Sequence, residues 1–90
     1  MNIEELYAVI EERIKNKNKK SYTNKLFKLG PKVIAQKIGE ETTELIIDYL
    51  KGSKKRTIEE ATDVIYHLLV LLKSKKITLK EINKELSKRH

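Results

Sequence analysis

The sequence of 90 residues contains no cysteine, two histidines, one proline and three glycines. The absence of cysteine excludes disulfide bonds and thiolate metal sites. Because two histidines are too few for the common zinc sites, any bound metal must rely on oxygen ligands, which favours Mg²⁺, with Mn²⁺ as a substitute. No apolar run reaches the ~20 residues of a membrane-spanning helix, and the acidic, amphipathic start MNIEELYAVIEERIK is unlike a signal peptide. We therefore expect a soluble, cytoplasmic protein without membrane contacts.

Positive charge dominates the composition. Twenty lysine and arginine residues stand against 13 aspartate and glutamate residues, which gives a net charge of +7. Such an excess favours an anionic partner, whether nucleic acid, nucleotide or phosphate. Lysine-rich surfaces also keep proteins soluble, so the charge alone does not distinguish a binding surface from a solvated one.

Apolar residues recur at helical spacing through most of the chain, and no segment shows the pattern of a strand. The expected helices cover residues 3–14, a short segment 21–29, 32–50, 57–73 and a last segment that begins at Thr78. Gly30 and Pro31 separate two of them, because glycine suits a helix C-cap and proline suits the first turn of a helix. The polar, basic segments 15–20 and 51–56 are expected to be loops.

Two helix starts carry a specific signal. Thr57 with Glu60, and Thr78 with Glu81, have the spacing of a capping box. No internal repeat or domain boundary interrupts the pattern. The sequence therefore predicts the all-α class: one domain over residues 1–90, built as a bundle of four to five helices.

The helix over 32–50 places an acid within its apolar stripe. At about 100° per residue the predicted stripe consists of Ile34, Ile38, Leu45 and Tyr49. Glu41 falls inside this stripe, while Lys37, Glu44 and Asp48 lie on its flank. A carboxylate in an apolar face is costly unless a cation compensates it. Lys37, one turn before Glu41, offsets part of the charge, and Asp48 is expected to face solvent.

The helix over 57–73 is apolar around most of its circumference. Its predicted core stripe is Ile58, Ala61, Ile65, Leu68, Leu69 and Leu72, and three further apolar residues lie outside that stripe. A helix of this kind is buried on more than one side, which indicates a bundle centre or a subunit interface. Glu60, Asp63 and His67 share the remaining face.

If the two helices pack side by side, Glu41 and Glu44 face Glu60 and Asp63. Four carboxylates that converge in a partly dry groove make a site for a hard cation. Each acid also has a plain alternative: Glu60 can serve as the N3 residue of a capping box, and the acids can form structural ion pairs. His67 is expected to be a hydrogen-bonded structural residue.

The order Glu40-Glu41-x-x-Glu44 followed by Glu60-x-x-Asp63 resembles the signature of the all-α nucleoside-triphosphate pyrophosphohydrolases, the MazG-like superfamily. Within it, the chain is most similar to the phosphoribosyl-ATP pyrophosphatase family. That similarity rests on Ser21-Tyr-Thr23, Gly30-Pro-Lys32, the run IAQKIGEE from Ile34, the run EATDVIYHLLVLL from Glu60 and the ending Glu85-Leu-x-Lys-Arg89. One departure is the segment before Ser21, where the family usually has a proline-rich turn.

The resemblance implies Mg²⁺-dependent hydrolysis of phosphoribosyl-ATP to phosphoribosyl-AMP and pyrophosphate, the second step of histidine biosynthesis. It also implies nucleotide binding by an intertwined homodimer, which agrees with the apolar circumference of the expected helix over 57–73. Carried over by position, the metal ligands are Glu41, Glu44, Glu60 and Asp63. Glu40 is the expected base that activates water. Phosphate contacts are expected from Lys37, Ser21, Thr23 and Lys25.

Two other functions stay open. A housecleaning pyrophosphatase for other nucleoside triphosphates would use the same carboxylates with a different base pocket. A helical nucleic-acid binder would account for the charge of +7, with an affinity that falls steeply with salt. We do not expect nucleic-acid binding, because such a surface gains nothing from acids placed in an apolar stripe.

Overall fold

The computed structural model describes residues 1–17 and 20–90, and every regular element in these ranges is a helix. The helices are α1 (Ile3–Asn16), α2 (Tyr22–Leu29), α3 (Pro31–Lys51), α4 (Lys54–Ser74) and α5 (Leu79–Arg89). This arrangement confirms the predicted all-α class. In the described ranges no helix is both long enough and apolar enough to cross a lipid bilayer.

Local sequence signals explain most helix ends. The Ser21 side chain caps α2, Gly30 ends it with a left-handed φ of 92°, and Pro31 begins α3. The predicted capping box of Thr78 and Glu81 is present at the start of α5. At the end of α1, Lys17 takes a left-handed φ of 51°. The rest of the predicted loop over 15–20 includes residues 18–19, which lie outside the described residues.

The predicted N-cap of α4 is wrong by four residues. Ser53, not Thr57, is the N-cap, because its hydroxyl accepts a hydrogen bond from the Arg56 main-chain N–H at 3.1 Å. The basic segment 54–56 is therefore the first turn of a helix instead of a loop. This start also removes the capping-box explanation for Glu60, which lies in the second turn of α4.

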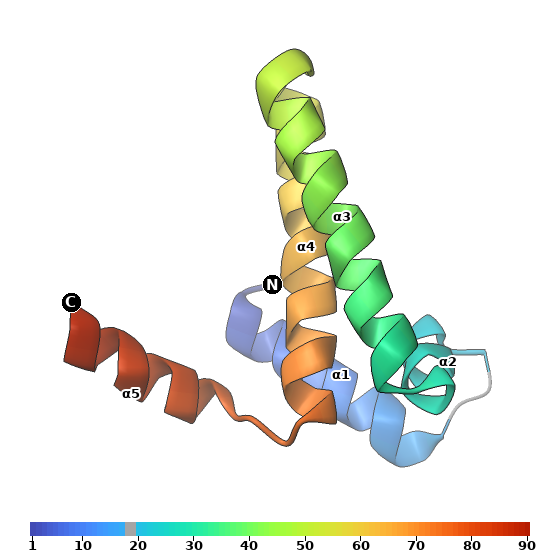
Figure 1. The fold of residues 1–90 in the computed structure, drawn as a ribbon. Coiled ribbons are helices and arrows are strands. Elements are labelled where there is room, and N and C mark those ends of the chain that lie inside the picture. The colour runs from blue at the N-terminus through green and yellow to red at the C-terminus, as the bar shows by residue number, and fades with distance from the viewer. Residues whose placement is uncertain (18–19) are drawn as a thin grey trace.

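Helices α3 and α4 form a long antiparallel hairpin, and α1 and α2 pack around its lower part (Figure 1). The buried apolar core lies there and consists of Tyr7, Ile10, Leu26, Ile34, Leu69, Val70 and Leu72. After α4 the chain turns, and α5 runs away from the hairpin (Figure 1). The hairpin therefore projects its connecting turn well beyond the core.

Several apolar residues that the helical pattern predicts as buried are exposed in the single chain. Tyr49 is 75% exposed, Ile58 57% and Leu68 40%. The pattern predicts apolar helix faces at these residues, but the helices of the described ranges leave these side chains largely uncovered. The radius of gyration is 14.0 Å, whereas a compact domain of this length has about 12 Å. The chain thus leaves part of its apolar surface without a partner.

Candidate metal centre

Three carboxylates meet across the α3–α4 hairpin. Oxygen atoms of Glu41 on α3 and of Glu60 and Asp63 on α4 all lie within 4.8 Å of one another. Glu60 is buried, Glu41 is half-buried and Asp63 is exposed. The group thus reaches from the helix interface to the solvent, so a small cation and a ligand bound to it have access.

The helical repeat explains this geometry. Residues three apart in a helix lie on the same face, which places Glu60 and Asp63 one turn apart along α4. Because α3 packs against α4 in the opposite direction, Glu41 faces this pair from the neighbouring helix. The structure therefore brings together three of the four carboxylates that were predicted to converge.

Glu60 is the most constrained acid of the group. It is 6% exposed, and its Oε2 atom is buried without a hydrogen-bond partner among the described residues. The pKa of Glu60 is raised from 4.5 to about 7, first by burial and then by its hydrogen bond with Glu44 and the negative charge of Glu44. The charges of Asp63 and Glu41 raise that pKa in the same direction. Near neutral pH the site thus retains a proton where a cation would fit.

The donor set suits a hard divalent ion. Carboxylate oxygens are the ligands that Mg²⁺ and Mn²⁺ prefer, and a buried oxygen without a donor is costly unless something compensates it. Glu44 is exposed but close enough to Glu60 to hydrogen-bond with its protonated carboxyl group. It lies beside the three-oxygen group, within reach of the same site. The residues present therefore fit a magnesium or manganese ion.

Glu40 and Lys37 pair with each other instead of with the cluster. The Lys37 Nζ atom lies 3.6 Å from Glu40 Oε2, and the Gln36 side-chain amide donates to Glu40 Oε1 at 2.9 Å. The hydrogen bond from Gln36 and the charge of Lys37 lower the pKa of Glu40. Lys37 thus pairs with an exposed neighbour on its own helix, and the expectation that it offsets part of the charge of Glu41 stays a prediction.

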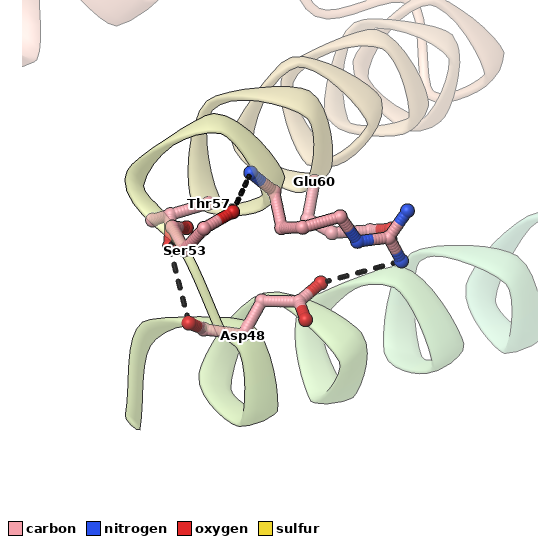
Figure 2. A network of polar contacts seen from close by, with 5 residues as sticks. Asp48, Ser53, Thr57 and Glu60 are labelled. Atoms are coloured by element: carbon pink, nitrogen blue, oxygen red, sulfur yellow. Dashed lines mark hydrogen bonds and ion pairs between the residues drawn. The ribbon is translucent and has the colours of Figure 1, made fainter. Parts of the chain in front are cut away.

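Asp48 does not face solvent as predicted. Its side chain is 17% exposed, and its Oδ2 atom lies 3.7 Å from Arg56 Nη2. The same nitrogen lies 3.7 Å from Glu60 Oε1. Figure 2 shows Asp48 and Glu60 on the two neighbouring helices. Near this pair, the Thr57 hydroxyl donates to the Asp48 carbonyl oxygen at 3.2 Å. Asp48 is thus tied to α4 by both its main chain and its carboxylate.

The helical pattern gives Arg56 no role, because it predicts a loop over 51–56. Once Ser53 is the N-cap, Arg56 lies one turn before Glu60, on the same face of α4. The sequence did contain a signal, since Gly52-Ser53 has the order of a helix stop followed by a cap. An earlier helix start would have given the spacing of an ion pair between Arg56 and Glu60.

The residues predicted from α2 have other contacts within the fold. The Ser21 hydroxyl caps the helix by accepting from the Asn24 main-chain N–H at 3.3 Å. Thr23 is fully buried, and its hydroxyl shares a hydrogen bond with the Tyr66 hydroxyl. Lys25 is exposed. The phosphate contacts of Ser21, Thr23 and Lys25 stay predictions, and both hydroxyls form bonds inside the protein.

Known proteins resemble this chain over nearly its full length. The family model described as phosphoribosyl-ATP pyrophosphohydrolase matches residues 3–90. A phosphoribosyl-ATP pyrophosphatase of Clostridium acetobutylicum is 51% identical over 88 residues, which cover 98% of this chain and 80% of that protein. The enzyme of that name from Sulfolobus acidocaldarius is 46% identical over 87 residues, or 97% of this chain and 92% of that protein. The chain belongs to the phosphoribosyl-ATP pyrophosphohydrolase family.

Proposed function

We propose that this protein hydrolyses phosphoribosyl-ATP to phosphoribosyl-AMP and pyrophosphate with Mg²⁺, as the second step of histidine biosynthesis. The names of the relatives support the substrate. The observation that carries the chemistry is the convergence of three carboxylates around Glu60, whose buried Oε2 atom has no hydrogen-bond partner in the described ranges. An acid in that position favours a bound cation over an empty groove.

In this proposal Glu41, Glu60 and Asp63 hold the metal, and Glu44 completes the ligand set from the solvent side. A Mg²⁺ ion held by these residues would neutralise phosphate charge and would make an attacking water easier to deprotonate. Glu60 must lose the proton that its raised pKa retains before it can act as a ligand. Cation binding is therefore expected to release protons near neutral pH.

Glu40 is the proposed general base, on its place in the family signature. Its carboxylate is exposed and its pKa is lowered by Gln36 and Lys37, so it is a weak base in the metal-free chain. We therefore expect Glu40→Gln to lower kcat less than Glu41→Gln does. Lys37 and Lys25 are the proposed point charges for the substrate's phosphates, with hydroxyl contacts from Ser21 and Thr23.

The proposed active form is a homodimer. The outer half of the hairpin carries a group of exposed apolar side chains: Ile46, Ile47, Tyr49, Leu50 and Ile58, each at least half exposed. Large exposed apolar patches are typical of protein–protein interfaces. A second copy of the same hairpin would cover this surface by two-fold symmetry, as in most soluble oligomers.

The test measures pyrophosphate release from phosphoribosyl-ATP, ATP and deoxynucleoside triphosphates, with Mg²⁺ and with a chelator. We expect turnover of phosphoribosyl-ATP only when Mg²⁺ is present, with Glu60→Gln inactive. Glu59→Gln is the matched control, since Glu59 is the adjacent exposed residue and has no place in the proposed site. Faster turnover of ordinary triphosphates would instead identify a housecleaning pyrophosphatase.

A further inference from the structure

Arg56 lies at the edge of the acidic group, between two carboxylates. Its Nη2 atom is 3.7 Å from Asp48 Oδ2 on α3 and 3.7 Å from Glu60 Oε1 on α4 (Figure 2). Hydrogen bonds between nitrogen and oxygen are about 2.7–3.2 Å long, so both contacts are ion pairs without a hydrogen bond. The two acids hold the guanidinium in place and leave its N–H donors available.

Burial of the three side chains is uneven. The Asp48 and Glu60 side chains are 17% and 9% exposed, whereas the Arg56 side chain is 59% exposed. The acids thus fix one edge of the guanidinium, and the rest of it faces solvent. Because the Arg56 main chain is bonded to the Ser53 cap, the base of the side chain is fixed as well.

The charge of the site calls for a nearby cation with free donors. Glu41, Glu44, Glu60 and Asp63 together carry four negative charges when ionised, and one Mg²⁺ ion neutralises two of them. The remaining negative charge would repel a polyphosphate. Lys37 lies within ion-pair distance of Glu40. Arg56 lies within ion-pair distance of Glu60, an acid of the group.

We infer that Arg56 binds the pyrophosphate portion of the substrate and of the leaving product, next to the metal held by Glu60. This inference rests on the proposed function. A guanidinium presents several N–H donors in a planar fork that matches two phosphate oxygens, which an ammonium group cannot do. Asp48 lies within ion-pair distance of the guanidinium and so joins α3 to α4 through Arg56.

The experiment measures the binding of inorganic pyrophosphate to the Mg²⁺-loaded protein by titration calorimetry, together with KM and kcat for phosphoribosyl-ATP. We expect Arg56→Gln to weaken pyrophosphate binding and to raise KM by about tenfold or more, the usual effect of losing a charge-assisted hydrogen bond. Arg56→Lys keeps the charge but loses the fork, so it should cause a smaller loss. Mn²⁺ affinity, measured by electron paramagnetic resonance, should not fall in either variant.

Arg89→Gln is the matched control. It breaks the pair between Arg89 and Glu85, which has the same helical spacing, on α5 and away from the acids. It should leave pyrophosphate binding unchanged. Asp48→Asn separates phosphate binding by Arg56 from the joining of the two helices. It removes the ion pair between Asp48 and Arg56 but leaves the Arg56 guanidinium in place. Its pyrophosphate affinity should stay within about threefold of the parent, a far smaller change than a lost charged contact causes.

The inference is overturned if Arg56→Gln binds pyrophosphate as tightly as the parent while its melting temperature falls as far as that of Asp48→Asn. Arg56 would then only join the two helices. Should Arg56→Gln fail to fold, equal pyrophosphate affinity of Arg56→Lys and the parent protein overturns it in the same way. A parent protein that binds pyrophosphate through Arg56 but does not hydrolyse phosphoribosyl-ATP would refute the proposed function and leave this inference standing.

Discussion

The ring of His67 is bonded to the main chain of Asp63, since its Nδ1 atom lies 2.8 Å from the Asp63 carbonyl oxygen. A carbonyl oxygen only accepts, so Nδ1 carries a proton, and in the neutral ring Nε2 accepts from the Tyr22 hydroxyl at 3.4 Å. The ring also meets Tyr66 edge-on, with 5.0 Å between centroids. His67 therefore links α2 to the turn of α4 that carries one acid of the cluster.

Replacing His67 by alanine should destabilise the protein. The substitution removes both hydrogen bonds and leaves a space between two tyrosine rings, which typically costs about 1–3 kcal/mol. Urea unfolding without divalent ions measures this loss. His90→Ala is the control, because His90 is exposed at the end of the chain. A similar loss in both variants would refute the structural role of His67.

The pKa of Glu60 predicts how stability depends on pH. Because the folded-state pKa of about 7 exceeds the ordinary value of 4.5, the folded protein binds this proton more tightly than the unfolded chain does. The contribution of this bound proton to the unfolding free energy is therefore complete below pH 4.5 and is lost as pH rises through about 7. We expect the unfolding free energy of the metal-free protein to fall over this interval. Glu60→Gln should remove that decline, and Glu59→Gln should keep it.

Saturating Mg²⁺ should cancel the decline that Glu60 causes. The ion requires the ionised carboxylate, so its stabilising effect grows as pH rises through about 7. Melting temperatures measured with and without Mg²⁺ at several pH values test this directly. A metal-induced shift that does not change with pH would mean that Glu60 is not a ligand.

Neutralising the other two acids should separate activity from stability. Glu41→Gln and Asp63→Asn are expected to reduce Mg²⁺-dependent turnover by roughly 100-fold or more, since even groups that only support a ligand cost 10–100-fold. Without metal, both variants should be as stable as the parent or slightly more so, because like charges are removed. If metal-free stability falls instead, the acids have a structural ion-pair role.

Contacts within one helix of the site could be predicted from the sequence, whereas contacts between the two helices could not all be predicted. The positions of Glu60 and Asp63 follow from the helical repeat alone, and the place of Glu41 in an apolar stripe indicated the opposing helix. The contact between Asp48 and Arg56 depends instead on how the turn at Gly52 sets the register of the two helices. That register is a tertiary property, and the wrong helix start concealed it.

Burial was harder to predict than helix position. Thr23 is predicted to contact phosphate, yet α2 turns it into the core against Tyr66. Tyr49 differs from its prediction in the opposite direction, since it lies on a stripe predicted to be buried but is exposed. Periodicity identifies the apolar face of a helix, but it does not identify the segment or subunit that covers that face.

The turn between α3 and α4 requires glycine at position 52. A Cβ atom there would lie 2.9 Å from the Asp48 carbonyl oxygen and 2.8 Å from its Oδ1 atom. The main-chain oxygen cannot move away easily, because it accepts from Gly52 N at 2.8 Å and from the Thr57 hydroxyl. We expect Gly52→Ala to cost about 1–3 kcal/mol in unfolding free energy.

Gly39 provides the opposite case in the same helix. A Cβ atom at Gly39 meets nothing within 4 Å, and its position inside α3 is helical. Gly39→Ala should therefore stabilise the protein by about 0.5–1 kcal/mol. Urea unfolding of both variants tests the pair. Equal changes of the same sign would show that the turn tolerates a side chain at position 52.

The exposed apolar group on the hairpin predicts a dimer that one charge should disrupt. Ile47 is 52% exposed on α3, so Ile47→Asp should place a carboxylate in the proposed interface, where an unpaired buried charge is strongly disfavoured. Light scattering after size exclusion should give twice the chain mass for the parent and the mass of one chain for Ile47→Asp. Leu29→Asp is the control, because Leu29 is 55% exposed on α2, outside that group. Dissociation by both substitutions, or a monomeric parent at every concentration, would place the second copy elsewhere or remove it from the proposal.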